Sequence, residues 1–517
     1  MPKKVSRKRA PLVLPQIVKP RWPVQGHGGK PRTAVITGVS GFLGSTLGAR
    51  FLMAHAGNSL RAVVRPKKGK SVKEREREIC LLLAFHMVCH EGVRRKRSLG
   101  FKEKIEQTAD LIQGQITFVE GFTDRPDFGL PLLQFNELAS GITDVINAAA
   151  SINFYEPLNE AIANNKISAE NFIKLVKEAK SNKGFHIGAH ISTAYAAGGT
   201  LLSTGRIILE TELPLEKNIG DAENLPDLLG RRLRTKEFFN VYEQTKAWAE
   251  LLIRRTQTRR EAEVEHHERM IEAQLPIMVL KPSIIVGHSQ SGWTPSFDPV
   301  VYPAFYMIWR NKLSALSVKS GYSRLDVVPL DFVSAAIQHL QIHAPLDKVL
   351  GNTFHLTSHP NDHLLIEDLV GACKLHYQEL TEDSDKPFKP KPTGLLTHGR
   401  ARILRNADSI REKLPGQKPV DQKVKNQRQT VFDYSKIGGH PFDTTQAQAI
   451  LEPKGISPPH LSDYLREILQ FCVDHHWRTP SIFTHDIIKK VAALPEKPRG
   501  SRSVRKSSKR KKGSEKD

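Results

Sequence analysis

The stretch "VITGVSGFLG" (35–44) constrains the fold more than any other part of the sequence. It joins an apolar, β-branched run to the helical run "STLGARFLMAHA" through Gly38, Gly41 and Gly44. Glycines at this spacing let the backbone approach a pyrophosphate closely, while the following helix directs its free N–H groups and positive dipole end at the anion. Strand, turn and helix together predict a dinucleotide site.

Further apolar runs have the nearly continuous, β-branched pattern of parallel strands that are covered on both faces. The six expected strands lie at 33–38, 60–65, 116–121, 142–150, 185–193 and 275–284. Amphipathic stretches such as 158–180 lie between them. Strands that alternate with helices predict an α/β fold, a Rossmann-type doubly wound parallel sheet.

The connection between the second and third expected strands is unusually long. Residues 66–115 are highly charged, and because structureless loops of this length are uncommon, we expect one or two inserted helices there. After about residue 360 the alternation fades, and 460–477, "HLSDYLREILQFCVDHHW", predicts an amphipathic helix. This later part predicts a smaller, mainly helical region.

The net charge of +23 is concentrated at the two ends of the chain. Residues 1–32 hold nine Lys or Arg and no acid, and residues 494–517 hold ten against three acids. Both ends lack apolar periodicity, so we expect disordered basic tails. Basic tails attract polyanions of any kind, so peripheral contact with an anionic membrane surface and a merely solubilising role both stay open. No specific nucleic-acid partner is predicted.

The cysteines predict neither a disulfide framework nor a metal site, because Cys80, Cys89, Cys373 and Cys472 form no CxxC pair and have no His at zinc-ligand spacing. The basic start is followed by no apolar segment of the signal-peptide kind, and no window reaches the roughly 18 apolar residues of a membrane span. We therefore expect a cytoplasmic protein with no transmembrane segment. The oligomeric state stays open.

The end of the second expected strand indicates which dinucleotide binds. An NAD site places an acidic residue there for the ribose 2′-hydroxyl, whereas this chain has "VVRPKKGK" with Arg65, Lys67 and Lys68. Guanidinium and ammonium groups attract a 2′-phosphate that a carboxylate would repel. The sequence therefore predicts NADP, the alternative being a solvated basic loop.

A tyrosine and a lysine four residues apart in "VYEQTKAWAE" predict acid–base chemistry. On a helix Tyr242 and Lys246 share a face, and the ammonium favours the ionised phenol, which predicts a lowered pKa for Tyr242. The spacing alone is common. It gains weight from its place after "HISTAYAAG", where Ser192 and Thr193 are expected at the ligand-binding carboxyl edge of the sheet.

The chain resembles the extended short-chain dehydrogenase/reductase family over roughly residues 33–360, and within it the fatty acyl-CoA reductase branch (male-sterility or thioester reductase type). The resemblance rests on "TGVSGFLG", "VVRPKKGKS" with the insert after it, "NAAASINFYEPLNEAIANN", "HISTAYAAG", "YEQTKAWAE", "LKPSIIVG", "SGW" and "DVVPLDFV". It implies NADPH-dependent hydride transfer to a fatty acyl-CoA or an acyl-carrier thioester, giving an aldehyde and/or a primary alcohol.

The resemblance also implies residue roles. Tyr242 would be the general acid, Lys246 its partner that also holds the nicotinamide ribose, and Thr193 the donor to the substrate carbonyl. The implied pyrophosphate turn consists of Gly38, Ser40, Gly41, Phe42, Leu43 and Gly44, and the implied 2′-phosphate ligands are Arg65 and Lys68. Ala149 would form a wall of the adenosine site, and Asn165 would be the structural Asn of the family. The implied nicotinamide-facing segment is Pro282, Ser283 and Ile284.

Three features depart from the family pattern. Phe122 stands where an acidic residue often holds the adenine, which leaves Asp124 or the backbone for that contact, and Lys281 stands where Arg is commoner. The region after residue 360 is shorter than the family's carboxy-terminal domain. Alternatives are a sugar-nucleotide epimerase/dehydratase or hydroxysteroid-type dehydrogenase, which the long insert disfavours, and a non-catalytic NADP-binding module.

These observations predict four segments along the chain. They are a disordered basic tail (1–32), an NADP-binding Rossmann domain with the helical insert (33–290), a substrate-binding and C-terminal region (291–480) and a second basic tail (481–517).

Overall fold

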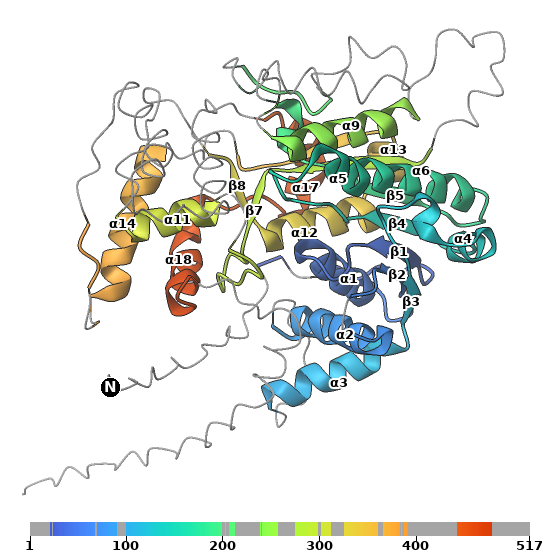
Figure 1. The fold of residues 1–517 in the computed structure, drawn as a ribbon, viewed down its shortest axis with the longest axis horizontal. Coiled ribbons are helices and arrows are strands. Elements are labelled where there is room, and N and C mark those ends of the chain that lie inside the picture. Colours follow the sequence, from blue (N-terminus) through green and yellow to red (C-terminus); the bar gives the residue numbers. More distant parts are fainter. Residues whose placement is uncertain are drawn as a thin grey trace, which may run out of the picture.

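A seven-stranded parallel sheet forms the centre of the molecule (Figure 1), with the strand order β3-β2-β1-β4-β5-β6-β9. The computed structural model describes residues 21–22, 24–67, 70–89, 100–198, 202, 206–211, 238, 240–256, 275–297, 301–311, 325–359, 366–382, 384, 387–390 and 442–477. The strands are β1 (Thr33–Thr37), β2 (Ser59–Val64), β3 (Ile116–Glu120), β4 (Asp144–Asn147), β5 (Ile187–Ile191), β6 (Ile277–Pro282) and β9 (Thr353–Leu356). All neighbours pair in parallel, and the order runs outward from β1 both ways, which confirms the doubly wound topology.

Helices cover both faces of this sheet, and each face has its own apolar core (Figure 1). The helices are α1 (Phe42–Ala54), α2 (Val72–Cys89), α3 (Phe101–Gln113) and α12 (Leu330–Gln338) on one side, and α4 (Leu132–Ala139), α5 (Leu158–Ile162), α6 (Ser168–Ala179) and α9 (Val241–Arg255) on the other. Successive strand side chains point to opposite faces, so Val35 packs in one core and Ile36 in the other. Because both faces of the sheet are buried, the strand sequences are nearly continuous apolar runs.

The long insert between β2 and β3 folds into α2 and α3, which confirms the expected helices. In α3, Ile105, Ala109 and Ile112 are buried at helical spacing, while α2 packs against both α3 and α1. The insert therefore lies directly beside the helix that follows the glycine turn.

The chain beyond residue 290 contributes to the Rossmann core as well as to a separate helical group. β9 extends the main sheet beside β6, and α12 packs against α1, so the division expected at residue 290 is crossed by both elements. A second parallel pair and further helices complete this part: β7 (Ile284–Val286), β8 (Val327–Pro329), α11 (Val301–Trp309), α13 (Leu346–Val349), α14 (Ile366–Thr381), α17 (Thr445–Leu451) and α18 (Leu465–Asp474). α18 confirms the helix expected within 460–477, and it packs on α14 at one side of the molecule (Figure 1).

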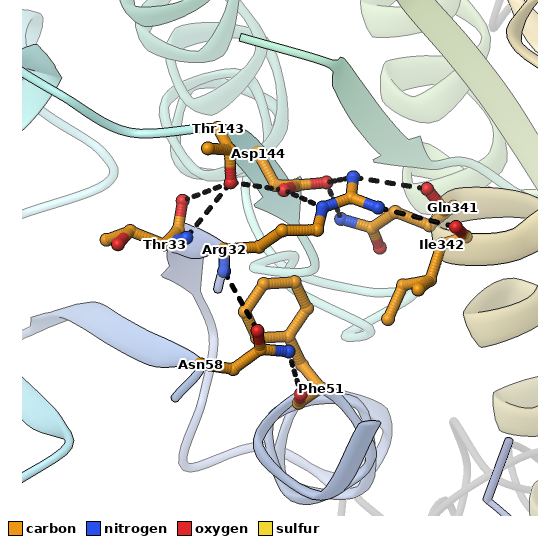
Figure 2. Close-up of polar contacts among 8 residues, drawn as sticks. All are labelled: Arg32, Thr33, Phe51, Asn58, Thr143, Asp144, Gln341 and Ile342. Carbon is orange, nitrogen blue, oxygen red and sulfur yellow. Dashed lines mark hydrogen bonds and ion pairs between the residues drawn. The ribbon is translucent and has the colours of Figure 1, made fainter. Parts of the chain in front are cut away.

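A buried ion pair joins the amino-terminal edge of the sheet to the segment after α12 (Figure 2). The Arg32 guanidinium binds both carboxylate oxygens of Asp144, its Nε lying 2.9 Å from Oδ2, and it also donates to the carbonyl oxygen of Gln341 at 3.3 Å. The Arg32 backbone N–H donates to Asn58 Oδ1 at 2.9 Å.

Residues 24–32 are thus part of the folded body, and the prediction of a disordered tail over 1–32 is wrong for this stretch. A count of charges cannot reveal the distant carboxylate that makes a buried arginine tolerable. The rest of that predicted tail up to residue 20, and the tail predicted over 481–517, lie outside the described residues.

Within the described ranges no helix combines the length and the apolar character needed to cross a membrane. In the same part of the chain no group of three or more His, Cys, Asp or Glu side chains could hold a metal ion.

Candidate active site

The glycine turn has the close backbone approach that its sequence predicts. Gly38 follows β1 with φ at +71°, and a Cβ there would lie 2.8 Å from the Ala149 backbone nitrogen, so only glycine fits without strain. A Cβ on Gly44 would lie 2.1 Å from the Gly38 oxygen. Helix α1 begins directly after Gly41, which supplies no side-chain cap to its first N–H groups. These donors are available to an anion.

An open cleft lies over this turn, at the carboxyl edge of the sheet. Its lining includes five of the predicted cofactor residues, namely Gly38, Ser40, Gly41, Arg65 and Ala149. Three other predicted residues, Phe42, Leu43 and Gly44, form the first turn of α1; Phe42 and Leu43 pack on the core and Gly44 is buried. Lys68 lies outside the described residues.

One end of the cleft is strongly basic, and one of its cations was missed by the sequence reasoning. Arg65, Lys67 and Arg75 all line it, Arg75 reaching in from α2. The Arg75 Nε is buried without a hydrogen-bond partner among the described residues. Burial lowers the pKa of Arg75; Glu78 opposes this, and the positive charge of Arg65 lowers the pKa further. In the sequence Arg75 belongs to "KEREREIC", whose alternating charges are typical of a solvent-exposed helix and do not indicate a cleft residue.

The segment after β3 faces the cleft with small residues. Gly121 and Thr123 line it, whereas the Phe122 ring is covered by the Arg125 guanidinium at 3.8 Å. Asp124 lies 3.9 Å from Arg65 between Oδ2 and Nη1. Gly121 and Thr123 line the cleft and Asp124 does not, so of the two adenine contacts that the sequence left open the backbone stays the prediction.

The predicted catalytic side chains come together where β5 ends against α9. The Thr193 side chain hydrogen-bonds Tyr242, and Thr193 Oγ1 lies 3.4 Å from the Pro282 carbonyl oxygen, to which it donates. One turn further along α9, Lys246 donates through Nζ to the Ile191 carbonyl oxygen. Burial lowers the pKa of Lys246 to about 8, although the Glu250 carboxylate raises it.

The expected lowering of the Tyr242 pKa is wrong for the protein alone. Burial raises the pKa of Tyr242 above its ordinary value, the Glu243 carboxylate raises it further, and the hydrogen bond with Thr193 lowers it. The Tyr–Lys spacing does not reveal the cost of placing a phenolate away from water. At neutral pH Tyr242 is a protonated hydrogen-bond donor.

Asn165 supports the site without lining the cleft. It lies in a π-helical turn (Ala163–Ile167) between α5 and α6, where its Oδ1 accepts from the Ser151 backbone N–H at 3.2 Å and its Nδ2 donates to Thr245 Oγ1 at 2.9 Å. Asn165 thus ties the loop after β4 to α9, while its neighbour Asn164 lines the cleft. Such turns are frequent at functional sites, because the extra residue redirects side chains.

The nicotinamide-facing segment predicted after β6 lies beside Thr193. Pro282 accepts the Thr193 hydrogen bond, and the Ser283 hydroxyl is buried without a partner among the described residues. Ile284 starts β7 and packs in the core. The Phe154 ring, from the loop after β4, lies 5.4 Å from the Tyr242 ring in a tilted arrangement. Because β4 and β5 are parallel, the cleft-lining residues 148–151 and Thr193, which follow these strands, lie at the same edge of the sheet, although Thr193 and Tyr242 are not among the residues that line the cleft.

A doubly wound parallel sheet with a glycine-rich first turn, a threonine just after β5 and a Tyr–Lys pair on α9 defines the extended short-chain dehydrogenase/reductase class. The family model described as "Male sterility protein" matches residues 36–337, and the chain belongs to this family. Among curated proteins it is 22% identical to fatty acyl-CoA reductase 2 of Homo sapiens over 64% of this chain, and 25% identical to fatty acyl-CoA reductase 1 of Mus musculus over 58%. The matches span 58% and 53% of those reductases.

Solved structures show the same fold. The terminal R domain of the myxalamid PKS-NRPS pathway aligns with a TM-score of 0.59 at 20% identity, covering 88% of this chain and 94% of that one. A thiolation-reductase di-domain of an archaeal non-ribosomal peptide synthetase aligns with a TM-score of 0.54 at 15% identity, covering 87% and 77%.

Proposed function

We propose that this chain is an oxidoreductase that uses NADPH to reduce a fatty acyl thioester, carried by coenzyme A or by a carrier protein, to an aldehyde and/or a primary alcohol. The observation that carries the proposal is the Thr193–Tyr242 hydrogen bond, with Lys246 one turn away, at the edge of the sheet where the cleft opens. The names of the matched curated reductases support the thioester as substrate.

The residues present fit a nicotinamide dinucleotide with a 2′-phosphate. The glycine turn leaves room and N–H donors for a pyrophosphate, and the guanidinium groups of Arg65 and Arg75 line one end of the cleft. The lowered pKa of Arg75 reports repulsion between these two cations as well as burial, and a dianionic phosphate between them would relieve it. The bound cofactor supplies the hydride.

Thr193 and Tyr242 act together on the substrate oxygen. Because the two hydroxyls lie close together, both can turn from their present acceptors to donate to one substrate oxyanion, and the raised pKa of Tyr242 keeps its proton available for that donation. Lys246, with a pKa of about 8, is mostly protonated at neutral pH and adds positive charge near the phenol. When the carbonyl carbon accepts a hydride, these donors would stabilise the resulting oxyanion. The oxyanion then re-forms a carbonyl, giving the aldehyde, as the carbon–sulfur bond breaks, and the thiolate that leaves takes a proton from water.

Purified protein, NADPH and palmitoyl-CoA provide the direct test. We expect NADPH consumption and an aldehyde or alcohol product detectable by gas chromatography. Tyr242→Phe is expected to lower kcat by about 10²–10⁴-fold, whereas Tyr306→Phe, at a partly exposed tyrosine of α11, leaves it unchanged. Activity on a sugar nucleotide or a sterol with none on acyl thioesters, or a Tyr242→Phe variant within a few-fold of the original, would overturn the proposal.

A cytoplasmic location and contact of the basic ends with an anionic membrane surface belong to the same proposal. Binding to anionic vesicles, compared between the full chain and a variant lacking residues 481–517, tests the membrane contact. Equal binding by both proteins would refute a role for that tail.

A further inference from the structure

The end of β5 is fastened to α9 at successive turns of the helix. Thr193 hydrogen-bonds Tyr242, and the Ile191 carbonyl accepts from Lys246 Nζ. The residue between them, Ser192, reaches the next turn of α9. Positions four residues apart on a helix lie on one face, so the strand end and the helix are held in register at three points.

The third point is Glu250, a buried carboxylate to which nothing above assigns a catalytic role. Ser192 Oγ donates to Glu250 Oε2 at 2.8 Å, Arg254 donates to Oε1 at 2.5 Å, and Lys281 Nζ lies 3.3 Å from Oε1. The side chains of Glu250 and Lys281 are both 0% exposed. Glu250 therefore binds the end of β5 through Ser192 and binds β6 through Lys281. Lys281 precedes Pro282, whose carbonyl oxygen accepts the hydrogen bond from Thr193.

A fully buried carboxylate is expensive unless it is paired, and well-packed apolar side chains often serve stability as well as a buried ion pair does. Burial raises the pKa of Glu250, but Lys281, Arg254 and the Ser192 hydrogen bond together bring it below its ordinary value. Glu250 is therefore charged. Its carboxylate lies one helical turn from Lys246 of α9, where it can hold the catalytic residues in place.

We propose that Glu250 is a positioning residue of this active site, whose carboxylate holds the ends of β5 and β6 on α9 and thereby fixes Thr193 and Lys246 relative to Tyr242. The inference rests on the proposed reductase function only for its kinetic readout. The proposed role concerns residues of this chain, and NADPH binding can be measured independently of the reductase activity.

The same carboxylate sets the charge of Lys246. Burial lowers the pKa of Lys246 to about 8, and Glu250 raises it. The other titratable or charged groups around this pair come from four segments: Tyr242, Glu243 and Arg254 on α9, His190 on β5, Lys281 on β6 and Glu210 of the segment 206–211. Removing the negative charge of Glu250 leaves the burial of Lys246 unopposed, so the pKa of Lys246 falls and the amine loses its proton at a lower pH.

Glu250→Gln tests this directly, because the amide keeps the shape and the hydrogen bond with Ser192 but not the charge. We expect kcat to fall at least tenfold and the alkaline limb of the kcat/KM profile to move down by about one pH unit. NADPH binding, followed by fluorescence across the same pH range, is expected to show the same shift. Ser192→Ala removes the hydrogen bond and keeps the charge, so its alkaline limb should stay in place.

Two controls separate positioning from folding. Glu178→Gln removes an exposed carboxylate of α6 and is expected to change nothing. If Glu250→Gln folds poorly because the buried Lys281 loses this carboxylate, the double variant Glu250→Gln/Lys281→Met removes both charges, and we expect it to recover the thermal midpoint but not kcat.

An unchanged kcat and pH profile in Glu250→Gln would overturn the inference. Full recovery of kcat together with the thermal midpoint in the double variant would overturn it as well, because it would show a merely structural role. If the original protein reduces no acyl thioester, the proposed function fails, while the pH dependence of NADPH binding still decides the role of Glu250.

Discussion

Lowering the pH should destabilise the protein in part through a histidine beneath the glycine turn. His86 of α2 is 0% exposed, and its Nε2 lies 3.0 Å from Ser45 Oγ in the first turns of α1. Burial lowers the pKa of His86 from 6.5 to about 3, and the nearby charges of His288 and Arg50 contribute. His86 is therefore neutral in the folded protein over a pH range in which it is charged in the unfolded chain.

The size of the effect follows from proton linkage. Because the folded-state pKa of this base is depressed, its contribution to stability is complete above pH 6.5 and is lost as the pH falls toward 3. Between pH 7 and about pH 4.5 the unfolded chain takes up nearly one proton that the folded protein does not. One unit of pKa difference corresponds to about 1.4 kcal/mol, so the free energy of unfolding should fall by about 2.5 kcal/mol.

The assay is urea unfolding at both pH values, followed by tryptophan fluorescence, since the Trp293 ring lies 5.0 Å from the His86 ring. His86→Gln keeps a hydrogen-bonding side chain toward Ser45 but does not titrate. We expect its loss of stability between the two pH values to be smaller than that of the original protein by about 2.5 kcal/mol. Buried histidines without a charge interaction with His86, such as His190 and His355, titrate in both proteins, so their contributions cancel. Equal losses in the two proteins would refute the reasoning.

Three further outcomes are expected. In steady-state kinetics, Arg75→Ala should raise the KM for NADPH by roughly 10–100-fold, because a charge-assisted hydrogen bond contributes about 1.5–3 kcal/mol. The KM for NADH should stay unchanged. The matched control is Arg77→Ala, because Arg77 lies on the same helix but pairs with an exposed carboxylate. Gly44→Ala places a Cβ 2.1 Å from a carbonyl oxygen of the turn and should abolish NADPH binding measured by fluorescence. Arg32→Met leaves Asp144 buried and unpaired and should lower the free energy of unfolding by about 3–5 kcal/mol in urea titrations.

The parts of the fold that depend on local pattern were predictable from the sequence. Six strands and the insert helices follow from apolar runs and helical spacing, and the glycine turn follows from backbone geometry that only glycine permits. β9 was not predicted, because "TFHL" is a short run and only its pairing with β6 makes it part of the sheet.

The parts that depend on distant neighbours were not predictable. Arg75 becomes a cleft residue because α2 places it near Arg65, and Arg32 becomes a core residue because Asp144 pairs with it. The pKa of Tyr242 depends on how deeply the phenol is buried, which the Tyr–Lys spacing does not reveal. In each case the sequence gives the residue type, but only the structure gives the neighbouring side chains that determine its role.

The Arg32 network of Figure 2 also bears on how the chain folds. The hydrogen bonds from Arg32 to Gln341 and Ile342 span 309 and 310 residues, so the first strand of the sheet is locked by a segment made long after it. Contacts of such sequence separation form late and slow the folding rate. A nascent chain therefore holds β1 and its glycine turn without their final anchor until residue 342 has left the ribosome, and during that interval the incomplete sheet exposes apolar surface to which chaperones can bind.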